Sequence, residues 1–203
     1  MSEAARRKMT ADEFYAWVRT RTEGRYELVD GEPVMMAGAT NRHDRVMRNA
    51  MRHLGNHLDG HPCQPFSNEI YIVIPAGNRR QADGGADCGT PDDMSMDADK
   101  PNMVLEVLSP TTRQFDRFEK VEEYKTVPTL EYIVLVDPDS PQVRLFSRLP
   151  DQSWTSTRLA GLDAELVLPR IGFRLPLWAL YPLRTFGVAS VYYNPGPQRL
   201  GLI

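Results

Sequence analysis

The feature of this chain that most constrains its fold is a short apolar run at residues 103–108, which a single carboxylate, Glu106, interrupts. Pro101 precedes the run and Pro110 follows it, so residues that end strands lie on both sides. A short apolar run between such residues is typical of a central strand that is buried on both faces. The chain therefore needs a sheet covered by a layer on each face, with one ionisable group held inside it.

The other segments with a clear pattern predict a mixed α+β (α/β) fold, in which helices flank a central mixed β-sheet with extra β-hairpins. Thr10 and Glu13 form a capping-box pattern at the start of the first helix, and Asp30-Gly31 favours a tight hairpin turn. Residues 79–101 are rich in Asp and Gly, and their pattern leaves open whether a strand crosses them. The predicted helices are 11–19, 41–58 and 113–125, and the predicted strands are 25–29, 33–36, 69–74, 132–136, 143–147, 154–159 and 166–168.

Length and composition favour one globular domain, which we predict over residues 1–186, followed by a loosely packed or partner-dependent tail at 187–203. No apolar stretch approaches the roughly 20 residues that span a bilayer, and no apolar segment follows the basic N-terminus, so we expect a cytoplasmic protein without a membrane partner. The two cysteines, Cys63 and Cys88, show no metal-binding spacing. We therefore expect neither a zinc site nor a disulfide, which fits a reducing compartment.

The net charge of −3 disfavours a dedicated nucleic-acid coat protein but does not exclude an enzyme that contacts DNA locally. The most basic segment is the predicted helix at 41–58, where four arginines lie opposite an apolar stripe. The simpler interpretation of this charged face is a solvated helix surface. Its arginines are Arg42, Arg45, Arg48 and Arg52, and the apolar stripe is Val46, Ala50, Leu54 and Leu58.

Glu106 is the first candidate for a functional group, because strand alternation places it with Val104 and Leu108 on a face that another layer must cover. Burying a carboxylate without a partner costs several kcal/mol or forces it to take up a proton. A cationic partner is therefore expected, and Lys120, Arg113 or a metal ion could supply it. A strand glutamate held in a purely structural salt bridge is the alternative.

Asp116, Lys120 and Tyr124 recur four residues apart, which places them on one stripe of the predicted helix at 113–125. The turn before this helix is short enough to fold it back against the preceding strand, so the stripe could meet Glu106. A divalent-metal site needs a second acid, because hard cations such as Mg²⁺ take oxygen ligands. Three aspartates compete for that place, namely Asp83, Asp87 and Asp92.

These motifs resemble the Uma2 family, a domain of unknown function whose members are candidate restriction endonucleases within the PD-(D/E)XK nuclease-like superfamily. The resemblance implies a restriction-endonuclease-like core and covers roughly residues 9–181. Its most specific part is the stretch from Glu106 to Tyr124. The other matching pieces are 9–14, 25–32, the helix around His43, 80–89, 133–138 and 161–164.

The resemblance also chooses among the three aspartates. It assigns the metal position to Asp83, ranks Asp87 second and makes Asp92 a residue of the following loop. Asp83, Glu106 and the backbone carbonyl of Val107 are then the implied ligands of Mg²⁺ or Mn²⁺.

Around these ligands the chain departs from the pattern of the family that it resembles. Ala82 replaces a proline before Asp83, and residues 84–86, Gly-Gly-Ala, replace β-branched residues after it. Leu108 stands where the superfamily pattern has a lysine. The resemblance supplies the lysine from the helix, as Lys120, and this is chemically acceptable because the reaction needs an ammonium near the attacked phosphate, whichever element presents it.

Four further residues are secondary site candidates. Glu27 faces either the site, as a third carboxylate, or the solvent, and the resemblance favours the site. His43, near a helix start, is more often a local hydrogen-bond partner than a catalyst. Asp116 and Tyr124 are expected to position Lys120.

The predicted catalytic set of Asp83, Glu106 and Lys120 favours a metal-dependent endonuclease that hydrolyses phosphodiester bonds in nucleic acid, with DNA as the first candidate. The resemblance also implies a homodimer. The alternative is a protein of the same fold that no longer cleaves and serves as a binding or assembly module. Hydrolysis of a small phosphate ester is a further alternative, because the same metal geometry serves it.

Overall fold

A six-stranded mixed sheet forms the centre of the computed structural model, which describes residues 7–109 and 115–181, with 115–117 described by their backbone alone. The strand order is β10-β9-β8-β7-β6-β3. β7 (Pro101–Val107) pairs in parallel with β8 (Tyr132–Asp137) and antiparallel with β6 (Gly84–Asp87). The predicted central strand and the mixed α+β fold class are therefore confirmed. The other strands of this sheet are β3 (Gln64–Ser67), β9 (Gln142–Arg148) and β10 (Trp154–Ala160).

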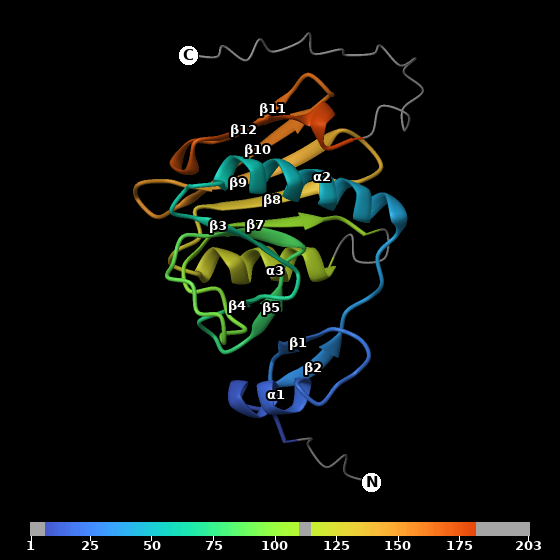
Figure 1. Ribbon diagram of the computed structural model, residues 1–203, viewed down its shortest axis with the longest axis vertical. Coiled ribbons are helices and arrows are strands. Elements are labelled where there is room, and N and C mark those ends of the chain that lie inside the picture. The colour runs from blue at the N-terminus through green and yellow to red at the C-terminus, as the bar shows by residue number, and fades with distance from the viewer. Residues whose placement is uncertain (1–6, 110–114, 182–203) are drawn as a thin grey trace, which may run out of the picture.

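One helix covers each face of this sheet (Figure 1). The odd-numbered side chains of β7, such as Leu105, pack in one core cluster with the apolar stripe of α2. Val104 packs in a second cluster with Val121 and Tyr124 of α3. Because side chains alternate along a strand, Glu106 lies on the face that α3 covers. The covering elements are α2 (Asn41–Leu58), α3 (Phe115–Thr126) and the hairpin of β11 (Glu165–Leu168) and β12 (Phe173–Pro176), which adds to the α2 layer.

A second, four-stranded sheet of order β2-β1-β5-β4 carries the first part of the chain. Its hairpin turn has Asp30 at φ 50° and Gly31 at φ 78°, as the sequence predicts. The capping box of Thr10 and Glu13 opens α1, whose Phe14 is buried against this sheet. The elements are α1 (Ala11–Val18), β1 (Tyr26–Val29), β2 (Glu32–Met35), β4 (Tyr71–Val73) and β5 (Arg79–Gln81).

The irregular segment at 79–101 contains the link between the two sheets. β5 belongs to the smaller sheet and β6 to the larger one, with Asp83 in the bend between them. Two short strands therefore cross the segment that pattern alone left open. Two single 3-10 turns, Pro169–Ile171 and Leu177–Ala179, flank β12.

The structure corrects the expectation for the two cysteines. β3 pairs antiparallel with β6 in a register that sets Gln64 opposite Asp87, so Cys63 and Cys88 lie opposite each other and form a disulfide. The sequence pattern does not predict β3, so the pairing that joins the two cysteines leaves no signal in the chain. The cytoplasmic location stays a prediction, now without the support of free thiols.

Two other predictions concern residues that the structure does not describe. The tail at 187–203 and Arg113 lie outside the described part of the chain, so their predicted roles stay predictions. Within the described ranges, no helix has the length and apolar character that crossing a bilayer requires.

Gly84 and Gly85 allow two neighbouring layers to approach β6 closely. A side-chain carbon on Gly84 would collide with the sulfur of Met51 on α2. One on Gly85 would collide with the carbonyl of Met103 and the ring of Phe66. These glycines therefore serve tight packing, and they hold the aspartate that precedes them in a closely fitted framework.

We expect Gly85→Ala to lower the free energy of unfolding by about 1–3 kcal/mol, because the added methyl group overpacks a site bounded by backbone. Urea denaturation followed by circular dichroism measures the change. Gly55→Ala is the matched control. Gly55 lies within α2, and the added carbon would meet only Pro65 of β3, at 3.9 Å. The control should gain up to about 1 kcal/mol from helix propensity. Equal stabilities of the two variants would contradict this account of β6.

Candidate functional site

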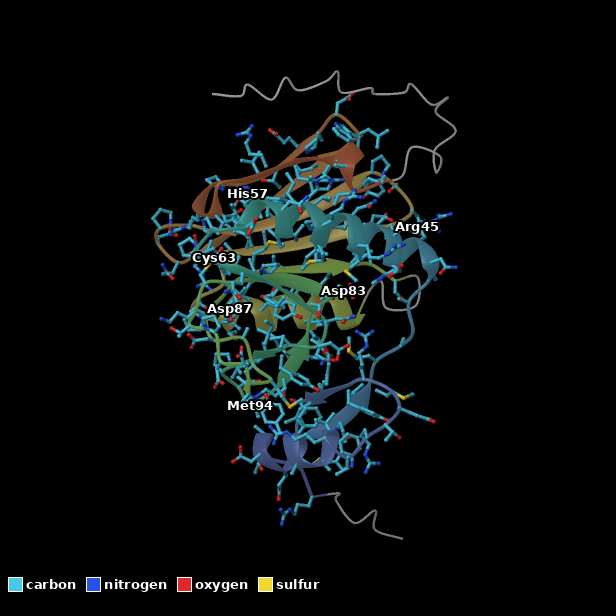
Figure 2. All side chains as sticks on the ribbon, viewed as in Figure 1. Arg45, His57, Cys63, Asp83, Asp87 and Met94 are labelled. Atoms are coloured by element: carbon cyan, nitrogen blue, oxygen red, sulfur yellow. A yellow bond between two sulfur atoms is a disulfide. The ribbon has the colours of Figure 1, made fainter. Side chains whose placement is uncertain are left out.

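A cavity of about 440 Å³ collects side chains from both sheets and from both covering helices. Figure 2 shows Asp83 beneath the first half of α2, on one side of the molecule, and Asp87 on the other side. The cavity lies on the Asp83 side. Its ionisable side chains include Glu27, Arg80, Asp83, Glu106, Lys120 and Tyr124.

Glu106 finds the cationic partner that its burial requires. Its Oε1 lies 2.9 Å from Nζ of Lys120 and accepts a hydrogen bond of 2.7 Å from the hydroxyl of Tyr124. Only 16% of its side chain is exposed. Burial raises the pKa of Glu106 to about 7; Lys120 and Tyr124 oppose this rise, and the negative charge of Asp83 adds to it. Two carboxylates that repel each other therefore share this end of the cavity.

Lys120 uses its ammonium group to join three parts of the fold. Its Nζ lies 3.0 Å from Oε1 of Glu27 and 2.9 Å from Oε1 of Glu106, and it donates to the carbonyl of Gln81 at 2.8 Å. Burial lowers the pKa of Lys120, but the two carboxylates outweigh it and hold this pKa above its ordinary value. Lys120 is therefore a permanent cation at neutral pH. It is not a general base.

Asp83 is held by the end of β7 and the start of α2. Its Oδ2 accepts a hydrogen bond of 2.7 Å from the N–H of Val107 and lies 3.1 Å from Nε2 of His43. Burial lowers the pKa of His43, and the hydrogen bond and charge of Asp83 raise it beyond that, so its net pKa lies above the usual value. The structure thus makes His43 a hydrogen-bond partner of Asp83.

Glu27 faces the site, which excludes the solvent-facing alternative. Its side chain is only 9% exposed and contacts Lys120, Arg80 and the N–H of Gln81. Burial raises the pKa of Glu27, but Lys120 and Arg80 lower it more strongly, so this carboxyl stays ionised.

Arg80 and Glu123 are part of the site framework, and sequence reasoning did not single them out. The guanidinium of Arg80 forms a two-pronged pair with Glu123 and also reaches Glu27 at 3.1 Å. Asn78 donates to the same Glu123 at 2.7 Å. The spacing of three residues between Lys120 and Glu123 was the available signal, since it places both on one side of the helix.

Two of the aspartates that the sequence left in competition do not join this group in the structure. Asp87 accepts hydrogen bonds from three backbone N–H groups between residues 89 and 100, so it closes a loop on the far side of β6. Asp92 accepts from the N–H of Met94 in an exposed loop. Asp116 lies on α3 with its side chain outside the described residues, so its role in positioning Lys120 stays a prediction.

The oxygen atoms of the site suit a hard divalent cation. Oδ1 of Asp83 and Oε2 of Glu106 accept no hydrogen bond from any residue that the structure describes. Within that part of the chain, no three His, Cys, Asp or Glu side chains gather closely enough to hold a metal ion. A third protein ligand would therefore be a backbone oxygen, and the Val107 peptide already contacts Asp83. Such a set fits Mg²⁺ or Mn²⁺, which keep several waters.

The fold is that of a nuclease-like domain. A crystal structure of "a putative nuclease belonging to DUF820" from Anabaena variabilis superposes with a TM-score of 0.70, covering 85% of this chain and 97% of that one. The two chains are 16% identical, so this likeness shows the fold alone. The chain belongs to the Uma2 family, described as "Putative restriction endonuclease", whose model matches residues 11–177.

Two relatives from Synechocystis extend over most of the chain. "Uncharacterized protein slr1290" is 27% identical over 176 residues, which are 86% of this chain and 92% of the relative. "Uncharacterized protein sll1609" is 27% identical over 170 residues, which are 82% of this chain and 96% of the relative. The family membership is therefore shown, while the roles of individual site residues stay predictions.

We expect Glu123→Ala to lower the free energy of unfolding by at least about 2 kcal/mol, because it removes one partner of a buried arginine. Thermal and urea unfolding measure the loss. Glu122→Ala is the control on the same helix, where the carboxylate pairs with Lys125 at the surface and is 48% exposed. The control should change stability by less than about 1 kcal/mol. If the two variants lost equal stability, the framework role of Arg80 and Glu123 would be wrong.

Proposed function

We propose that this protein is a metal-dependent nuclease that hydrolyses phosphodiester bonds in nucleic acid, with DNA as the expected substrate. The observation that carries the proposal is the meeting of Asp83, Glu106 and Lys120 in one cavity. Two electrostatically coupled carboxylates beside a buried ammonium are suited to charge developing on a phosphate. The family description supports the same reaction class.

Asp83, Glu106 and the carbonyl of Val107 would hold the divalent cation, Mg²⁺ or Mn²⁺. When bound, the cation polarises a phosphate oxygen and lowers the pKa of a coordinated water. It would also offset the repulsion that contributes to the raised pKa of Glu106. The reaction joins the oxygen of water to phosphorus and breaks one phosphorus–oxygen ester bond.

The chain's own residues divide the remaining work. Lys120 places a fixed positive charge beside Glu106, where it offsets negative charge on the phosphate in the transition state. Tyr124 stays a neutral donor, since burial and the nearby Glu106 raise its pKa well above the ordinary value. Glu27 and Arg80 hold Lys120 in place, and His43 orients Asp83.

A binding or assembly module is the second candidate, and Leu108 favours it. This apolar side chain lines the cavity at the position where the superfamily pattern has a lysine. This candidate predicts nucleic-acid or protein binding without turnover. A homodimer remains an expectation under both functions.

Lys120→Met should reduce cleavage of supercoiled plasmid DNA in Mg²⁺ by at least about 100-fold, because the charge beside the phosphate is lost while most of the side-chain volume remains. Lys125→Met on the same helix, which removes a lysine paired at the surface with Glu122, should cleave at the wild-type rate. Circular dichroism verifies that both variants fold. Wild-type turnover by folded Lys120→Met would remove Lys120 from the mechanism.

Asp83→Asn should abolish the binding heat of Mn²⁺ in titration calorimetry, since it neutralises one of two carboxylate ligands. Asp87→Asn should bind Mn²⁺ like the wild type, because Asp87 closes a loop away from the cavity. The comparison separates the two aspartates that the sequence left in competition. Wild-type protein that neither binds Mn²⁺ nor cleaves DNA would favour the module.

A further inference from the structure

Arg25 differs from every other cationic side chain on the wall of the site cavity, as far as the structure describes it. His43, Arg80 and Lys120 each contact a carboxylate. Arg25 lines the same cavity, has no described ion pair, and carries a buried Nη1 without a hydrogen-bond partner. Arg25 as a whole is partly exposed, and no described residue accepts a hydrogen bond from its guanidinium, so this group can pair with an acceptor from outside the chain.

The β1–β2 hairpin places Arg25 in line with the reactive groups. The N–H of Met36 donates to the carbonyl of Arg25 at 2.8 Å, so the hydrogen-bonded pairing of β1 with β2 continues to the residue before β1. Alternate residues share a strand face, and Arg25, Glu27 and Val29 all line the cavity. At about 3.3 Å per residue, Arg25 stands about 7 Å along the strand from Glu27, which contacts Lys120. That spacing is comparable with the separation of successive phosphates along a nucleic-acid strand.

The neighbouring strand gives this end of the cavity an apolar wall. Val34 and Met35 of β2 line it and are 47% and 64% exposed. A free guanidinium beside exposed apolar side chains suits a ligand that alternates phosphate groups with flat, weakly polar rings. An isolated phosphate ester would occupy the carboxylate end alone.

We propose that Arg25 binds a phosphate of the substrate strand other than the one that is cleaved. This inference rests on the proposed nuclease function and deepens it, because it makes a strand with successive phosphates the ligand of the cavity. Arg25 is then a specificity-determining residue that selects strands over small phosphate esters. Arg80 cannot take this role, because Glu27 and Glu123 occupy its guanidinium.

Binding is tested without turnover, by fluorescence anisotropy of a short labelled DNA in Ca²⁺. Arg25→Gln should weaken binding about tenfold and reduce the salt dependence of the affinity by about one phosphate contact. Arg25→Lys should recover part of the loss. Arg21→Gln is the control, because Arg21 lies close to Arg25 in the chain but stacks on Trp17 and does not line the cavity. Equal affinities of wild type and Arg25→Gln, equal losses in both glutamine variants, or no DNA binding by the wild type would overturn the proposal.

Hydrolysis of bis(4-nitrophenyl) phosphate provides the second arm, because this ester carries a single phosphate. Arg25→Gln should raise the KM for DNA about tenfold and lower kcat/KM for this ester by a much smaller factor. An equal loss on both substrates would overturn the selective role of Arg25. If the wild type hydrolysed neither substrate, the proposed nuclease function would be wrong. The anisotropy result would still decide separately whether Arg25 binds a strand.

Discussion

The buried ammonium of Lys120 is the interaction on which the rest of the site depends. It touches Glu27 from the small sheet, Glu106 from the large sheet and the carbonyl of Gln81 from the strand before Asp83. Two carboxylates buried this deeply would be strongly unfavourable without a cation between them. The contact therefore ties α3 to both sheets at one point, and any ligand that enters the cavity meets a preformed arrangement of charges.

The framework around this contact is organised by close packing. Gly84 and Gly85 admit Met51 of α2 and Phe66 of β3 to within contact distance of β6. The helix that approaches over these glycines begins near His43, which is how His43 reaches Asp83. Gly84 and Gly85 thus do not loosen the site. They bring its second covering layer close to it.

The arginines of the cavity show how one residue type serves two purposes. Arg80 is saturated by Glu27 and Glu123 and acts as a structural support for the carboxylate that holds Lys120. Arg25 stands on the same wall without an acceptor among the described residues. The ion pairs of Arg80 therefore stabilise the framework, whereas the guanidinium of Arg25 remains for the ligand that we propose. In the proposed role of Arg25, the β1–β2 hairpin is a binding element as well as part of the fold.

Local sequence patterns determined much of this protein by themselves. The capping box at Thr10, the Asp30-Gly31 turn, the apolar run of β7 and the face of Glu106 follow from periods and propensities that neighbouring residues set. The spacing of Lys120 and Tyr124 likewise predicted a stripe that could meet Glu106. The resemblance to the family chose Asp83 among three aspartates, which the spacing of the chain could not do.

Only the tertiary structure decided which distant groups meet. The pairing of β3 with β6 joined Cys63 to Cys88, and the approach of β1 to β5 brought Glu27 to Arg80 and turned it inward. These contacts depend on the register between strands and on the volume of side chains in three layers. Neither produces a periodic pattern in the sequence. Sequence determines which face of an element a residue occupies, and packing between elements determines what that face touches.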